Sequence, residues 1–176
     1  MWGRARAAAG QALARDVEVF ERLGYRRGEK AGPLAMRLDP PDGERPLVVR
    51  IAPEGRIFGG SYALELSTAE PVVPGSRGLS ARGRGLVRLS RVAFRARRGD
   101  AAGEALARRL DADTRLQEAL AAVHFERVRV EPDGRAVVRH MGGSVVWVLF
   151  PPVVRPIPLT VEQARATVRA LDAFSS

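Results

Sequence analysis

The sequence predicts one α+β domain over residues 1–176, in which an antiparallel sheet packs with N-terminal, central and C-terminal helices. Hydrophobic residues make up 45% of the 176 positions, which is enough for one substantial core. Candidate strands follow one another in runs instead of alternating singly with helices, a pattern typical of antiparallel sheets. We expect about six to seven strands. A similarity between residues 49–56 and 128–135 leaves open a duplication into halves 1–98 and 99–176.

The first predicted helix spans residues 5–23. Apolar side chains recur near one of its faces, at Ala9, Leu13, Val17 and Phe20. Gly24 follows the last of them, where a glycine often ends a helix because it accepts the left-handed backbone conformation.

Alternating apolar residues predict the strands of the first half at 34–38, 47–52, 56–66 and 86–96. The turn between the second and third of these is expected at Pro53-Glu54-Gly55. Residues 72–85 are rich in Gly, Ser and Arg and are expected to form a loop. A bulge near Ser90 would bring the apolar residues of strand 86–96 onto one face and leave Arg88 and Arg95 on the other.

In the second half, Asp100 is expected to cap a central helix, and Thr114 with Gln117 a second one. Three strands are then expected at 126–131, 135–141 and 145–150, the first two joined by the turn Pro132-Asp133-Gly134. Residues 151–158 are rich in proline and predict a rigid connector. Thr160 and Gln163 form a capping box that opens the last helix.

Positive charge is concentrated in one stretch of the chain. From Pro71 to Gly99 there are eight arginines and no acidic residue, whereas the whole chain carries a net charge of only +9. Such a local excess indicates an anionic partner, which could be an acidic protein, a nucleic acid or a phosphorylated ligand. The most favoured function is therefore a non-enzymatic binding protein with an arginine-rich surface. Single-strand binders also interleave aromatic side chains, and this stretch contains only Phe94.

Four arginines are the candidate anion-binding residues: Arg77, Arg82, Arg84 and Arg88. The first three belong to the predicted loop, whose exposed amides could also hold an anion. Arginine suits this role because its planar guanidinium donates several hydrogen bonds to phosphate or carboxylate. The loop has glycines but neither a Walker lysine nor a Gly-x-Gly-x-x-Gly pattern after a strand.

An enzyme of unrecognised type is the first alternative. With a three-residue turn at 132–134, Glu126 is expected opposite His140, and the two would form a minimal acid–base pair. A surface ion pair across two strands is the other interpretation of this pattern. The second alternative is a small-ligand-binding domain, which would need a sizeable apolar cavity.

No cofactor or metal site is predicted. The chain has no cysteine, and its two histidines lack the His-Glu-x-x-His spacing of a zinc site. No apolar run approaches the about 20 residues of a membrane helix, and the N-terminus lacks the apolar core of a signal peptide. We therefore expect a cytoplasmic protein.

Residues at the turns and element ends of the second half, together with some apolar positions, resemble those of a known family. They are Phe94 to Asp100, then Ala105, Leu106, Leu110 and Asp113, then Val128-Arg129-Val130, Asp133-Gly134, Pro151-Pro152 and Pro158-Leu159-Thr160. On these residues the segment Phe94 to Phe174 resembles an uncharacterised bacterial family, a domain of unknown function. The resemblance implies no activity, cofactor or catalytic residue.

Overall fold

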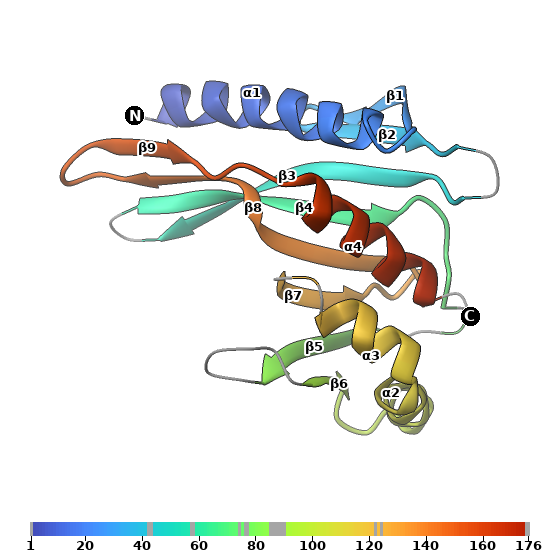
Figure 1. The fold of residues 1–176 in the computed structure, drawn as a ribbon. Coiled ribbons are helices and arrows are strands. Elements are labelled where there is room, and N and C mark those ends of the chain that lie inside the picture. The colour runs from blue at the N-terminus through green and yellow to red at the C-terminus, as the bar shows by residue number, and fades with distance from the viewer. Residues whose placement is uncertain are drawn as a thin grey trace.

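A large antiparallel sheet carries the helices on one of its faces (Figure 1). The computed structural model describes residues 2–41, 44–56, 59–73, 75, 78–84, 91–121, 123 and 125–174, with the backbone alone at 2, 56, 82–84 and 91. The described helices are α1 (Trp2–Glu21), α2 (Ala101–Ala112), α3 (Thr114–Ala121) and α4 (Val161–Ala173). The α+β class and the N-terminal, central and C-terminal helices are as predicted.

The described residues form nine strands, more than the six to seven expected. They are β1 (Arg26–Gly32), β2 (Ala35–Asp39), β3 (Leu47–Arg56), β4 (Gly59–Thr68), β5 (Leu79–Arg84), β6 (Arg91–Ala96), β7 (Phe125–Val130), β8 (Ala136–Val148) and β9 (Val153–Pro156). Their order across the sheet is β1-β2-β3-β4-β8-β7-β5-β6, and β9 pairs with β8.

The core lies between the helices and the inward-facing residues of the strands. In β4, Leu64 and Leu66 are fully buried, and their partners across the ladder to β3, Ile51 and Val49, are buried with them. Phe20 at the end of α1 is also fully buried. Because side chains alternate along a strand, the intervening residues point to the opposite, uncovered face of the sheet.

Three helix starts are built by the polar side chains expected there or next to them. Thr160 and Gln163 form the predicted capping box of α4, and the Asp100 carboxylate accepts a hydrogen bond from the Gly103 amide at the start of α2. The α3 helix is capped by Asp113, which accepts from the Leu116 amide, and not by Thr114. The Gln117 side chain instead accepts a hydrogen bond from the Val92 N–H of β6, at the edge of the sheet.

Two predicted boundaries in the first half are wrong. β3 continues through Pro53-Glu54-Gly55 to Arg56, where a turn was expected. Proline is tolerated there because β2 pairs with β3 only as far as Arg50, so no strand on that side needs an amide from Pro53. β5 lies within residues 72–85, which were expected to form a loop. Leu79 and Ala81 are buried and alternate with the exposed Ser80, as in a strand with one face toward the core.

In the second half, two predicted strands are joined into one, and one strand was not predicted. β8 runs unbroken over the two strands expected at 135–141 and 145–150, with an irregularity near Gly142 and Gly143 that shifts its register against β4. β9 occupies part of the proline-rich stretch expected to be a connector, as an edge strand ending at Pro156. The similar segments 49–56 and 128–135 have different structures, because the second crosses a turn. Division into two related halves stays a prediction.

Candidate anion-binding surface

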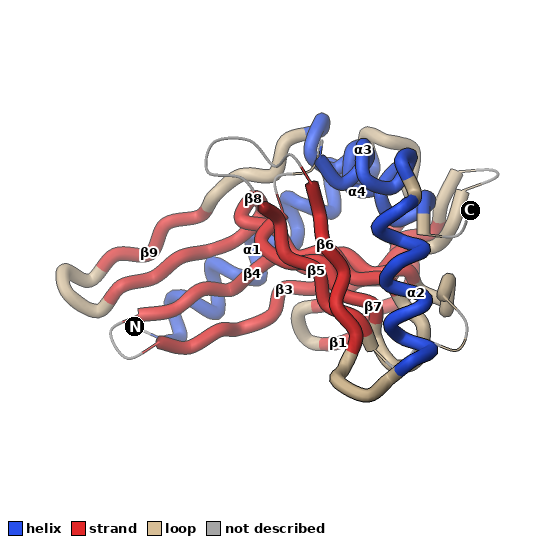
Figure 2. Tube along the Cα trace, turned by 90° about the horizontal axis from the view of Figure 1, so that it is seen from below, coloured by secondary structure: helices blue, strands red, loops and turns tan. Residues whose placement is uncertain are grey.

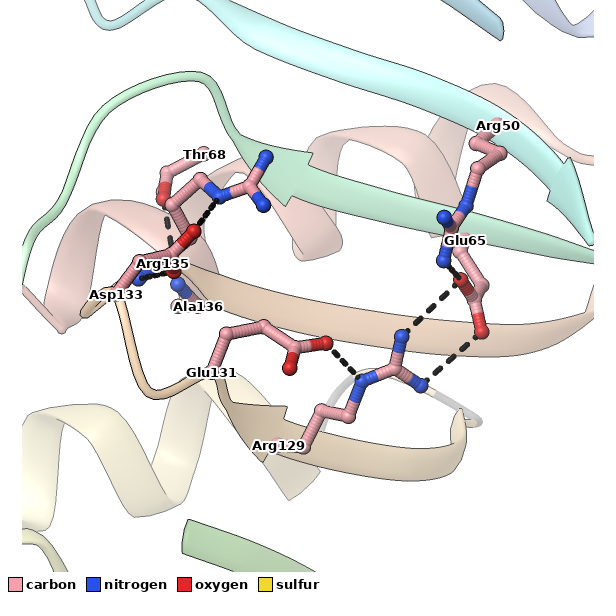
Figure 3. A network of polar contacts seen from close by, with 8 residues as sticks. All are labelled: Arg50, Glu65, Thr68, Arg129, Glu131, Asp133, Arg135 and Ala136. Atoms are coloured by element: carbon pink, nitrogen blue, oxygen red, sulfur yellow. Dashed lines mark hydrogen bonds and ion pairs between the residues drawn. The ribbon is translucent and has the colours of Figure 1, made fainter. Parts of the chain in front are cut away.

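The uncovered face of the sheet carries a network of ion pairs (Figure 3). Glu65 of β4 lies between Arg50 of β3 and Arg129 of β7. The distances are 2.5 Å from Arg50 Nη2 to Glu65 Oε2 and 3.1 Å from Arg129 Nη1 to Glu65 Oε1. Arg129 also donates from Nε to Glu131 Oε1 at 2.6 Å, so two carboxylates fix the position of its guanidinium.

The environment of Glu65 keeps it ionised. Burial by itself would raise the pKa of this carboxyl, which is only 4% exposed, but hydrogen bonds from Arg50 and Arg129 bring it below the usual value. The Arg129 pKa is raised by Glu65 and Glu131 in spite of its own desolvation. Both partners therefore remain charged, and Arg129 is held rigidly on the open face.

Beside this network lies a shallow depression of about 580 Å³, which we call the arginine trough. Its polar side chains are Ser80 of β5, Arg95 and Arg97 at the end of β6, and Arg127, Arg129 and Glu131 at β7. Ser80 pairs with Arg95 on one side and with Arg129 on the other. Neighbouring strands lie about 4.8 Å apart, so the two rows of arginines stand about 10 Å apart across a low floor formed by β5.

Three of the four arginines in the trough have no acidic partner within the described part of the chain. Among the described residues, no ion pair involves Arg95, Arg97 or Arg127, and all three are exposed. Arg129 is paired with Glu65 and Glu131, but its guanidinium has five N–H donors and only three are used. The trough therefore combines a fixed guanidinium with three free ones and one carboxylate, a combination suited to oxyanions.

The outer edge of β6 is closed by side chains from the helices. The Gln117 amide oxygen accepts from the Val92 N–H at 3.0 Å, and Asp111 Oδ1 accepts from the Phe94 N–H at 2.8 Å. Helix α2 runs alongside β6 in Figure 2. These two amides are unavailable to another strand, so a partner approaching here meets the arginine side chains and not a free backbone edge.

Two of the four predicted anion-binding arginines, Arg77 and Arg88, lie outside the described residues. Arg82 and Arg84 lie in β5, where they pair with Ala93 and Arg91, and their side chains are not described. The expected bulge near Ser90 also lies outside the described residues.

Sequence reasoning missed Arg127 and Arg129 because they lie far from the acid-free stretch. Their alternation with the buried residues Val128 and Val130 was the available signal that both face outward. Arg95 was correctly expected on the outer face of its strand, opposite in parity to the buried Phe94. Nothing local indicated that β5 would bring the two pairs of arginines to opposite sides of one trough.

The structure does not bring His140 and Glu126 together. Phe125 lies opposite His140, because a register shift at Glu126 displaces the ladder by one residue. Glu126 instead pairs with Arg139 Nε at 3.2 Å on the outer face. His140 points inward, is fully buried, and lies 2.8 Å from Thr167 Oγ1 through its Nε2. The predicted cross-strand register was wrong by this one residue.

Burial lowers the pKa of His140 to about 4, so its imidazole is neutral near pH 7. The nearby Ser144 hydroxyl donates to the His140 carbonyl at 2.8 Å and accepts from the Leu64 amide at 3.1 Å. Ser144 therefore stabilises the irregular segment of β8 through both of its hydrogen bonds.

A second depression, of about 630 Å³, lies at the outer ends of β4 and β8. Small and apolar residues dominate its lining, among them Ala63, Met141, Val146 and Val148, with Glu126 as its acidic member. Within the described part of the chain, no three histidine or acidic side chains converge as they would around a metal ion. No helix of that part is long and apolar enough to cross a membrane.

A family model described as a protein of unknown function, DUF3156, matches residues 21–176. The chain belongs to the DUF3156 family. The match is wider than the segment from Phe94 that carried the resemblance in the sequence, and it includes every residue of the arginine trough. It begins at the last residue of α1, although α1 contributes buried residues such as Val17 and Phe20 to the core of this DUF3156 protein. A search of curated proteins and a search of solved structures each gave no significant match.

Proposed function

We propose that this DUF3156 protein is a non-enzymatic binding protein whose arginine trough holds an anionic partner. The observation that carries the proposal is the set of three exposed arginines, Arg95, Arg97 and Arg127, that surround one depression and have no acidic partner among the residues that the structure describes. Because several guanidiniums around one depression raise the local positive potential, the cluster favours an anion supplied from outside.

The charge distribution along the chain supports the same proposal. The acid-free stretch from Pro71 to Gly99 supplies Arg95 and Arg97 directly, and it also contains β5 with Arg82 and Arg84. Partner approach would be accelerated by the positive field, and the acceleration would fall as salt screens it. We place this activity in the cytoplasm, with which a cysteine-free chain is compatible.

Neutralising the free arginines tests the proposal. We expect Arg95→Gln/Arg127→Gln to weaken binding to immobilised anionic polymers, measured by surface plasmon resonance with poly-glutamate, heparin and a nucleic acid as separate ligands. The matched control is Arg108→Gln/Arg165→Gln, which removes the same charge from exposed positions on α2 and α4. Equal loss in both double variants would mean that net charge alone binds the polymers, and the trough would then have no role.

A further inference from the structure

We infer that the anionic partner is a single nucleic-acid strand, held by its phosphodiester backbone along the arginine trough without contacts that read the bases. This inference rests on the proposed function, and it names the class of partner. It follows from the shape of the trough, the spacing of its arginines and the kinds of side chain that line it.

The width of the trough suits one backbone. Arg95 and Arg129 flank Ser80 in the ladder, with about 10 Å between the outer strands, and the serine side chain leaves the floor low. A duplex has two backbones joined by base pairs and is too broad to enter between these rows. A single backbone can lie along β5 and accept hydrogen bonds from both sides.

The spacing along each row suits a repeating anion. Arg95 and Arg97 are two residues apart, as are Arg127 and Arg129, which places each pair about 6.6 Å apart along its extended segment. A nucleic-acid strand presents a charged phosphate at every repeat. An extended acidic peptide presents every second carboxylate at the same interval of about 6.6 Å, so competition with poly-glutamate is needed to separate the two kinds of partner.

Among its described residues, the trough lacks the aromatic side chains with which many single-strand binders stack on bases, so we expect its contacts to be with phosphates. Its described lining contains no aromatic side chain to stack on bases and no asparagine or glutamine to pair with adenine, and its guanidiniums are the groups best suited to phosphates. The polar groups of the lining are guanidiniums, one hydroxyl, one carboxylate and backbone. Binding is therefore expected to be independent of sequence and driven by release of counterions.

The trough also continues as a strand that carries further arginines. β5 extends beyond Ser80 to Arg84 and includes Arg82, within a stretch that has no acidic residue. A small phosphorylated ligand would need only the depression itself. A basic strand that runs on from it favours a polymer.

Fluorescence anisotropy with labelled oligothymidylate, oligoadenylate and a duplex of equal length tests the inference, with poly-glutamate as an unlabelled competitor. We expect equal affinity for the two single strands, weaker binding of the duplex and steep loss with salt. Arg95→Gln/Arg127→Gln should weaken binding about tenfold at low salt, which corresponds to about 1.4 kcal/mol for the two contacts together. The slope of log K against log salt should fall by about 1.4, because each single-strand phosphate contact contributes about 0.7.

The control Arg108→Gln/Arg165→Gln should show the same slope of log K against log salt as wild type, whereas the trough variant should not. If the trough variant loses binding of poly-glutamate and no oligonucleotide binds, the inference is overturned while the proposed function stands. If neither polymer binds, both are overturned. A preference for one base or for the duplex also overturns the inference. So does an oligonucleotide affinity that is the same for the trough variant and for wild type.

Discussion

At the scale of single residues, two buried titratable groups lie on the inner face of the sheet without full hydrogen bonding. Asp16 of α1 is 3% exposed, and burial raises its pKa to about 8 in spite of the nearby Arg15. Its Oδ2, like Nδ1 of His140, has no hydrogen-bond partner among the described residues. A β-carbon at Gly143 would lie 2.7 Å from Asp16 Oδ2, so glycine gives this carboxyl the space it occupies.

Asp16 makes stability depend on pH in a direction opposite to His140. The unfolded carboxyl ionises near pH 3.8 while the native one holds its proton to about pH 8, so stability falls as pH rises between these values. His140 is neutral in the native state down to about pH 4 and charges near pH 6.5 when unfolded, so it makes stability rise over that interval. The two effects oppose each other up to about pH 6.5, and above it only the effect of Asp16 remains.

We therefore expect Asp16→Asn to be stabilised relative to wild type by an amount that grows between pH 6.5 and 8. The growth should approach about 1.4 kcal/mol per pH unit, the value for one proton, as measured by urea unfolding at several pH values. Asp133→Asn is the control, because Asp133 is exposed and its pKa is already lowered in the native state. Parallel pH curves for wild type and Asp16→Asn would contradict the assignment.

At the scale of elements, helix starts and core faces were predictable because their signals are local. Thr160 and Gln163 are three residues apart, and the apolar face of α1 repeats within a few turns. Strand ends depended on partners far away in the chain. Pro53 stays within β3 because β2 has already ended, and the one-residue displacement at Glu126 depends on how β7 meets β8. The residues next to Pro53 and Glu126 give no signal for either feature.

The closed edge of β6 gives a prediction at this scale. Asp111→Ala should lower the free energy of unfolding by about 1–3 kcal/mol, because the Phe94 N–H loses its acceptor. It should also cause concentration-dependent self-association in sedimentation velocity, since an unpaired edge can add a strand from another molecule. Asp113→Ala is the control variant, because it removes the N-cap of α3 and leaves the hydrogen bond from Phe94 to Asp111 in place. If both variants sediment as wild type does, the edge is protected by something other than Asp111.

At the scale of the whole molecule, the α+β class could be predicted and an arginine-rich surface could be expected, but the position of the trough could not. Its parts come from Ser80, Arg95 and Arg129, which only the antiparallel pairing of β5 with both β6 and β7 brings together. The cluster of arginines in the sequence indicated the kind of partner that we propose. The position of the surface depended on β7, on the far side of two helices in the chain.

Binding of a nucleic-acid strand in the arginine trough is tested most directly by an NMR titration that observes arginine Nε–Hε signals while a short oligothymidylate is added. We predict that the signals of Arg95, Arg97, Arg127 and Arg129 shift together and saturate, while those of Arg108 on α2 and Arg165 on α4 do not move. Saturating shifts confined to Arg108 and Arg165, or no shift in the trough at concentrations where the oligonucleotide is bound, would contradict it.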